Sequence, residues 1–100
     1  MEEVPVVKVA KTERNARMPT KGSEHAAGWD LYCLEDTRIN FRSSVKIKTG
    51  LRVAIPEGFE GQVRARSSLG SKGLILPHSI GTIDADYRGE LFVLMTWIGE

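Results

Sequence analysis

The sequence predicts an all-β domain, built as a sandwich or a barrel. Apolar and polar residues alternate with a period of two in many short segments, whereas the 3.6-residue period of an amphipathic helix is hard to find. Turn-forming residues separate these segments at close spacing, as in other all-β domains. A length of 100 residues fits one domain, residues 1–100, with a modest core.

The expected strands follow one another along the chain. Residues 4–10 alternate and form the first strand, whereas residues 11–25 are charged, lack a periodic apolar face and predict a surface loop. Pro56-Glu57-Gly58 predicts a turn, because proline presets its own φ and glycine accepts a positive φ. The remaining strands are expected at residues 29–34, 37–41, 45–48, 51–55, 59–66 and 73–76.

The last expected strand, residues 91–98, is apolar without alternation. Such a strand is typically buried on both faces, here either between subunits or as an ordinary core strand. Glu100 follows two residues after this run. We therefore expect that the strand pairs with another chain or that the chain is a C-terminally truncated piece of a longer protein.

Composition argues against several classes of function. The net charge is +1 and basic residues form no long run, so nucleic acid and anionic membranes are not expected partners. The N-terminus lacks the pattern of a signal peptide, and no window approaches the roughly 20 apolar residues of a membrane span. Cys33 is the only cysteine, which excludes a disulfide framework. It is expected in the core. A cytoplasmic location is expected.

Residues 81–90 (GTIDADYRGE) place two carboxylates and a tyrosine on a tight turn between two strand-like segments. Asp84 and Asp86 can position a metal or activate water, or they can simply bond to turn amides. Tyr87 can offer its flat face to a sugar or a base, or it can pack against its neighbours. His78 is interpreted as a surface residue, with ligand contact as the less favoured alternative.

Upstream, a flexible turn carries a cationic side chain and hydroxyl donors instead of carboxylates. These residues are Arg66, Ser67 and Ser68. A guanidinium binds phosphate as a fork, hydroxyls add single hydrogen bonds and turn amides can point inward, although such segments are often solvated surface. Asp30 lies between aromatic residues at the start of an expected strand, where it either caps a turn or meets a partner at the mouth of a site.

Taken in order, three segments resemble the first three motifs of the trimeric dUTP diphosphatase (dUTPase) family. They are residues 26–32 (AAGWDLY), 61–69 (GQVRARSSL) and 81–90, of which the third matches almost residue for residue. The resemblance implies a jelly-roll-like fold, a homotrimer with shared active sites, and hydrolysis of dUTP to dUMP and pyrophosphate with Mg²⁺.

The resemblance also implies roles for individual residues. Asp84 falls on the general base that activates the attacking water, Tyr87 on the residue beneath the deoxyribose, and Asp30 on the carboxylate that holds Mg²⁺ through water. The phosphate-binding positions correspond to Arg66, Ser67 and Ser68. The uracil-reading hairpin corresponds to the backbone around Thr82, Ile83 and Phe92, and His78 stands where the family often has asparagine.

The chain departs from the family pattern in three respects. Ala65 replaces a proline, Ser68 replaces a glycine, and the fourth and fifth motifs are absent, so weak binding and slow turnover are expected. Residues 66–69 also resemble the phosphate segment of dCTP deaminases, but Leu94 stands where that chemistry needs a glutamate. A non-catalytic nucleotide-binding or assembly module is the other alternative.

Overall fold

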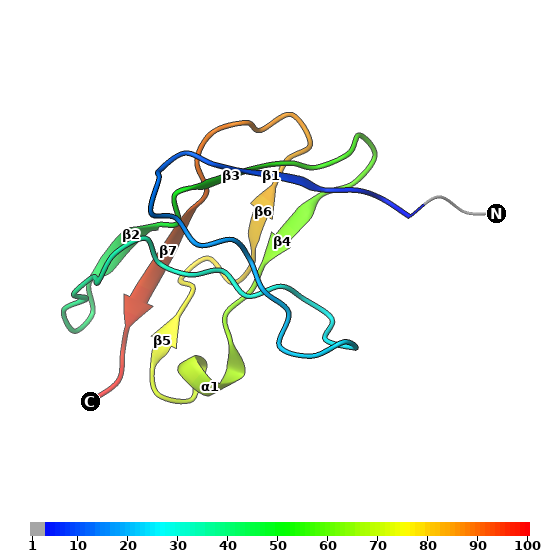
Figure 1. Ribbon diagram of the computed structural model, residues 1–100. Helices are drawn as coiled ribbons and strands as arrows, with labels where there is room; N and C mark the ends of the chain where they lie inside the picture. The colour runs from blue at the N-terminus through cyan, green and yellow to red at the C-terminus, as the bar shows by residue number, and fades with distance from the viewer. Residues whose placement is uncertain (1–3) are drawn as a thin grey trace.

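The computed structural model describes residues 4–100 (Figure 1). Residues 1–3, on which the signal-peptide expectation partly depends, lie outside the described part. Within it the chain forms strands and one short helix. These are β1 (Lys8–Lys11), β2 (Ser44–Lys48), β3 (Leu51–Ala54), β4 (Gly61–Val63), α1 (Ser67–Gly70), β5 (Leu74–Ile75), β6 (Gly81–Ile83) and β7 (Phe92–Trp97). The all-β prediction is confirmed.

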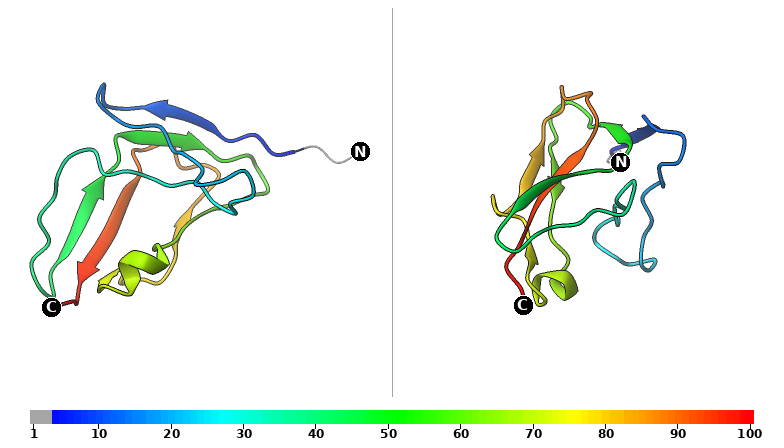
Figure 2. Two further views of the ribbon diagram at one scale, coloured as in Figure 1. Left: turned by 60° about the horizontal axis from the view of Figure 1, so that its bottom comes forward. Right: turned by 90° about the vertical axis from the view of Figure 1, so that its left-hand side faces the viewer.

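The strands form three small antiparallel sheets. β1 pairs with β3, β4 pairs with β6, and β7 lies between β2 and β5. Figures 1 and 2 show β1 and β3 side by side at one end of the molecule, with α1 at the opposite end. The short strands are as expected where turn residues recur at close spacing.

The core is small and lies where β3 meets the start of β7. Val53, Ile55 and Leu91 form a buried cluster. Buried Thr49 is satisfied as well, because its hydroxyl donates to the Leu91 carbonyl at 2.7 Å and accepts from the Leu51 amide at 3.2 Å. These contacts fix the point at which the chain leaves the turn of residues 84–90 and enters β7.

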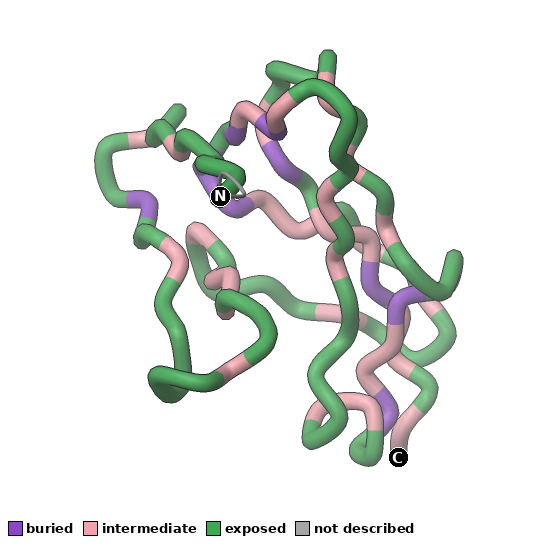
Figure 3. Tube along the Cα trace, turned by 90° about the vertical axis from the view of Figure 1, so that its right-hand side faces the viewer, coloured by how far each residue is buried: buried purple, intermediate pink, exposed green. Residues whose placement is uncertain are grey.

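Two expected strands are wrong. Residues 29–34 and 37–41 make only isolated bridges, Thr20 with Asp30 and Phe41 with Trp97. Leu31 packs against the core cluster, but Trp29 and Phe41 are 64% and 58% exposed, so these segments contribute little to the core. Alternation alone does not supply a neighbouring strand, and without one these segments run as loops whose residues are exposed or half-buried. Figure 3 shows how short the buried stretches of the chain are.

Cys33 is exposed, so its predicted place in the core is also wrong. The physical reason is the same, since Cys33 belongs to the segment that failed to join a sheet. The first strand is shifted as well, to Lys8–Lys11.

β7 is less buried than its composition indicates. Leu91 and Met95 are buried, but Phe92 and Ile98 remain 44% and 54% exposed. Burial on both faces is therefore not achieved within residues 4–100, and burial between subunits stays a prediction.

The segment expected to be a flexible turn forms α1 instead. The amides of Leu69 and Gly70 donate to the carbonyl of Arg66, at 3.1 and 2.9 Å. A single helical turn is too short to produce a detectable 3.6-residue period, which explains why the pattern missed it. Within residues 4–100 no helix combines the length and hydropathy needed to cross a membrane.

Candidate functional site

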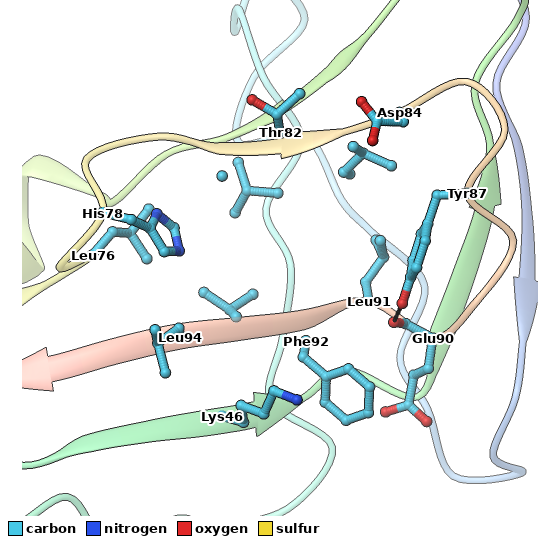
Figure 4. A pocket seen from close by; sticks show the side chains of 14 residues that line it. Lys46, Leu76, His78, Thr82, Asp84, Tyr87, Glu90, Leu91, Phe92 and Leu94 are labelled. Carbon is cyan, nitrogen blue, oxygen red and sulfur yellow. Dashed lines mark hydrogen bonds between the residues drawn. The ribbon is translucent and has the colours of Figure 1, made fainter.

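A cleft of about 300 Å³ opens between β6 and β7 (Figure 4). The two strands belong to different sheets, so the turn between them does not close a hydrogen-bonded hairpin, contrary to the prediction. Each strand already has its partner on the far side, β4 for β6 and β2 for β7. The strands therefore diverge from the turn and leave a space that side chains from both of them line.

The edge of β7 that faces this cleft carries backbone groups available to a ligand. Successive backbone groups of a strand point to alternate edges. The Ile98 amide donates to Gly73 on the β5 side, whereas the Trp97 carbonyl accepts from Arg42 on the other side. By this alternation the N–H and C=O groups of Phe92 and Leu94 point to the β5 side, beyond the end of β5 itself. Within residues 4–100 no strand pairs with them there.

The turn of residues 84–90 is closed by its own hydrogen bonds. The Tyr87 amide donates to the Asp84 carbonyl at 3.1 Å, and the Tyr87 hydroxyl donates to the Glu90 carbonyl at 2.7 Å. The Arg88 guanidinium donates to the carbonyls of Ala85 and Tyr87, at 2.6 and 3.0 Å. Local bonds of this kind fix where the side chains of the turn point.

The two carboxylates of the turn differ in position. Both residues are exposed, but Asp84 lines the cleft and Asp86 does not. Among the described residues, no donor is hydrogen-bonded to the Asp84 carboxylate. The alternative that this carboxylate bonds to turn amides is therefore not supported. Of the two, Asp84 is the carboxylate placed to act on a molecule in the cleft.

Most residues predicted around Asp84 are brought together here. The predicted residues that line the cleft are His78, Thr82, Ile83, Asp84, Tyr87 and Phe92. Sequence reasoning missed Lys46, Leu76 and Glu90 as lining residues, and had considered Leu94 only for deamination. Lys46 faces Leu94 in the register of β2 with β7, a pairing that no local pattern reveals.

The other predicted residues lie elsewhere in the chain. Asp30 and Arg66 line a second cavity of about 380 Å³, where Arg66 Nε is 3.9 Å from Asp30 Oδ1. The Arg66 side chain is 66% exposed, so this contact adds little stability and leaves the guanidinium free to meet an anion. Ser67 and Ser68 are exposed on α1, next to Arg66 in the chain.

Within one chain the two sets of residues are separated. Figure 2 shows the turn of residues 84–90, in orange, and α1 at opposite ends of the molecule. The two cavities share three lining residues, Val63, Leu76 and Val93. Asp84 and Arg66 thus line different cavities of the chain.

Comparison with known proteins identifies the family. The dUTPase family model matches residues 14–99. The deoxyuridine 5'-triphosphate nucleotidohydrolase of Zymomonas mobilis is 46% identical over 87 residues, which are 86% of this chain and 60% of that protein. The enzyme of the same name from Syntrophotalea carbinolica is 44% identical over 94% of this chain and 66% of its own length. The chain thus spans 60% to 66% of these curated relatives.

Solved structures agree with this result. A mutant dUTPase from phage phi11 of S. aureus, whose structure describes the coordination of a structural Mg(II) ion, matches with a TM-score of 0.87 and 32% identity, over 95% of this chain and 61% of that one. A mutant dUTPase of Staphylococcus bacteriophage 80alpha, solved with dUpNHpp, matches with a TM-score of 0.87 and 33% identity, over 95% and 56% of the two chains. By sequence and by fold, the chain belongs to the dUTPase family.

Proposed function

We propose that this protein hydrolyses dUTP to dUMP and pyrophosphate. The observation that carries the proposal is the cleft in which Asp84, Tyr87 and the open edge of β7 meet. The named activity of the relatives and the dUpNHpp bound by the 80alpha phage enzyme support it.

Uracil fits the open edge of β7. The edge presents backbone donors and acceptors at Phe92 and Leu94, and uracil bonds to such an edge as another strand would. Cytosine reverses part of the donor and acceptor pattern, which leaves backbone groups without partners and strongly disfavours its binding. We place the base here, with Thr82, Ile83 and His78 around it.

We propose that Asp84 takes the proton from the attacking water. The water attacks the α-phosphorus in line, and pyrophosphate leaves from the opposite side. We assign the phosphates to Arg66, Ser67 and Ser68 of a neighbouring copy, because within one chain these residues lie apart from Asp84. The assembly that we propose is a homotrimer with shared sites.

Mg²⁺ is the cation that this chemistry calls for, because it neutralises charge on the phosphates. Among the described residues no group of three or more His, Cys, Asp or Glu side chains forms a metal cage. The single accessible carboxylate of Asp30 still fits, since Mg²⁺ is commonly held by one or two carboxylates, several waters and the substrate phosphates. We propose that Asp30 holds it through water.

The direct test is to incubate the purified protein with dUTP and Mg²⁺ and to separate the products by ion exchange. Equal amounts of dUMP and pyrophosphate are expected, and a chelator should stop their formation. Binding of dUTP without products would instead indicate a non-catalytic module. Ammonia released from dCTP would indicate a deaminase, which Leu94 in the cleft disfavours because its side chain cannot transfer protons.

We also propose a cytoplasmic location for the protein as a dUTPase.

Replacing Tyr87 with alanine is expected to relax the discrimination against UTP. The ring lines the cleft, and we propose that it occupies the space that a 2′-hydroxyl would need. The ratio of kcat/KM for dUTP to that for UTP should fall by roughly tenfold or more, the scale of a lost steric contact. An unchanged ratio in steady-state assays with both nucleotides would refute this role.

A further inference from the structure

We propose that Gly89 is a specificity-determining positioning residue, whose missing side chain makes the seat for the Tyr87 ring. The inference rests on the proposed function, since it concerns how the cleft tells deoxyribose from ribose. It assigns the placement of the ring to a residue that itself does not line the cleft.

The contact between Gly89 and the ring is too close for any side chain. A Cβ atom added at Gly89 would lie 2.6 Å from Tyr87 Oη, 2.8 Å from Cζ and 3.2 Å from Cε1. Carbon atoms that are not bonded to each other do not approach so closely, and an aromatic ring is rigid. The whole Tyr87 side chain would have to rotate away from its place over Gly89.

Backbone conformation does not explain the glycine. The glycines with positive φ are Gly50, Gly58 and Gly73, so Gly89 does not lie in the left-handed region that favours glycine. Gly89 is exposed, and its substitution creates no cavity. The three atoms nearest to an added methyl group all belong to the Tyr87 side chain.

The ring is held from its hydroxyl end as well. Its hydroxyl donates to the Glu90 carbonyl at 2.7 Å, as Figure 4 shows. Glu90 is in turn tied to the chain just after β1, because the Thr12 hydroxyl donates to Glu90 Oε1 at 3.1 Å. A methyl group at Gly89 would push the hydroxyl off this carbonyl and tilt the ring face that meets the sugar. Steric discrimination is sensitive to such a shift, since it depends on contact distances.

The test compares Gly89→Ala with Gly22→Ala. Gly22 also lacks positive φ and has nothing within 4 Å of an added Cβ, so it controls for the general effect of replacing glycine. The ratio of kcat/KM for dUTP to that for UTP should fall by roughly tenfold or more in Gly89→Ala, the same steric scale as above, and stay at the parental value in Gly22→Ala. Melting temperatures measured in parallel should remain close to that of the parent.

A double variant separates this role from a structural one. If Gly89 acts through Tyr87, adding Gly89→Ala to Tyr87→Ala should change the selectivity no further. Parental selectivity in Gly89→Ala, or an additional loss in the double variant, would overturn the proposal.

NMR separates this proposal from the proposed function. Nuclear Overhauser effects between the Tyr87 ring protons and the Gly89 α-protons are expected in the nucleotide-free parent and should be weakened in Gly89→Ala. If these NOEs are present but dUTP is neither bound nor hydrolysed, the proposed function is wrong and the placement of the Tyr87 ring by Gly89 is retained. If the NOEs are absent in a protein that does hydrolyse dUTP, only the placement of the ring by Gly89 is wrong.

Discussion

Replacing Asp84 with asparagine is expected to lower the rate of dUTP hydrolysis by a factor on the order of 10² to 10⁴, the usual contribution of a general base. Asparagine keeps the shape and a hydrogen-bonding oxygen but cannot accept the proton of the attacking water. The affinity for dUTP should stay nearly parental, because other residues hold the base and the phosphates in the site that we propose. Single-turnover rates and equilibrium binding of dUTP measure the two effects separately.

Asp86→Asn is the matched control for this experiment. It makes the same chemical change two residues along the same turn, on a carboxylate that does not line the cleft. Its hydrolysis rate should be close to that of the parent. Equal losses in both variants would show that charge on the turn matters rather than a base at Asp84, and full activity of Asp84→Asn would remove the proposed mechanism.

Mixing two inactive variants is expected to restore activity. Asp84→Asn lacks the proposed base and Arg66→Ala lacks a proposed phosphate contact, and the two positions line different cavities of one chain. If each site combines Asp84 of one copy with Arg66 of another, random mixing of equal amounts leaves about a quarter of the sites intact. Recovery after joint denaturation and refolding is measured as pyrophosphate released per protein.

The control for this mixing experiment places both substitutions on one chain. A double variant mixed with Asp84→Asn contains no intact base, so its activity should stay at the level of the unmixed variants. Activity of the first mixture that does not exceed the sum of its parts would place the complete site within a single chain. That outcome would also remove the main argument for a shared homotrimeric site.

Much of this architecture is predictable from local patterns. Period-two alternation located β2 and β3 nearly to the residue, and the composition of residues 81–90 indicated a turn rich in functional groups. These features depend on neighbouring residues, so a single sequence contains them. The same reasoning gave strands at residues 29–34 and 37–41, where the alternation is present but a partner strand is absent.

The features that sequence reasoning missed depend on contacts between distant segments. The pairing of β2 with β7 places Lys46 opposite Leu94 and brings both to the cleft. The divergence of β6 from β7 depends on the partners that each strand has in other sheets. Neither relation has a local periodicity, so the residues of the turn were predictable while the shape of the cleft was not.

The open edge of β7 has a consequence beyond recognition of the base. A strand edge with free N–H and C=O groups is also a template onto which strands of other molecules can add. Native proteins usually protect such edges with charge, proline or a covering loop. A base bound as we propose would cover the groups of Phe92 and Leu94, so dUTP is expected to lower any self-association of the protein through this edge.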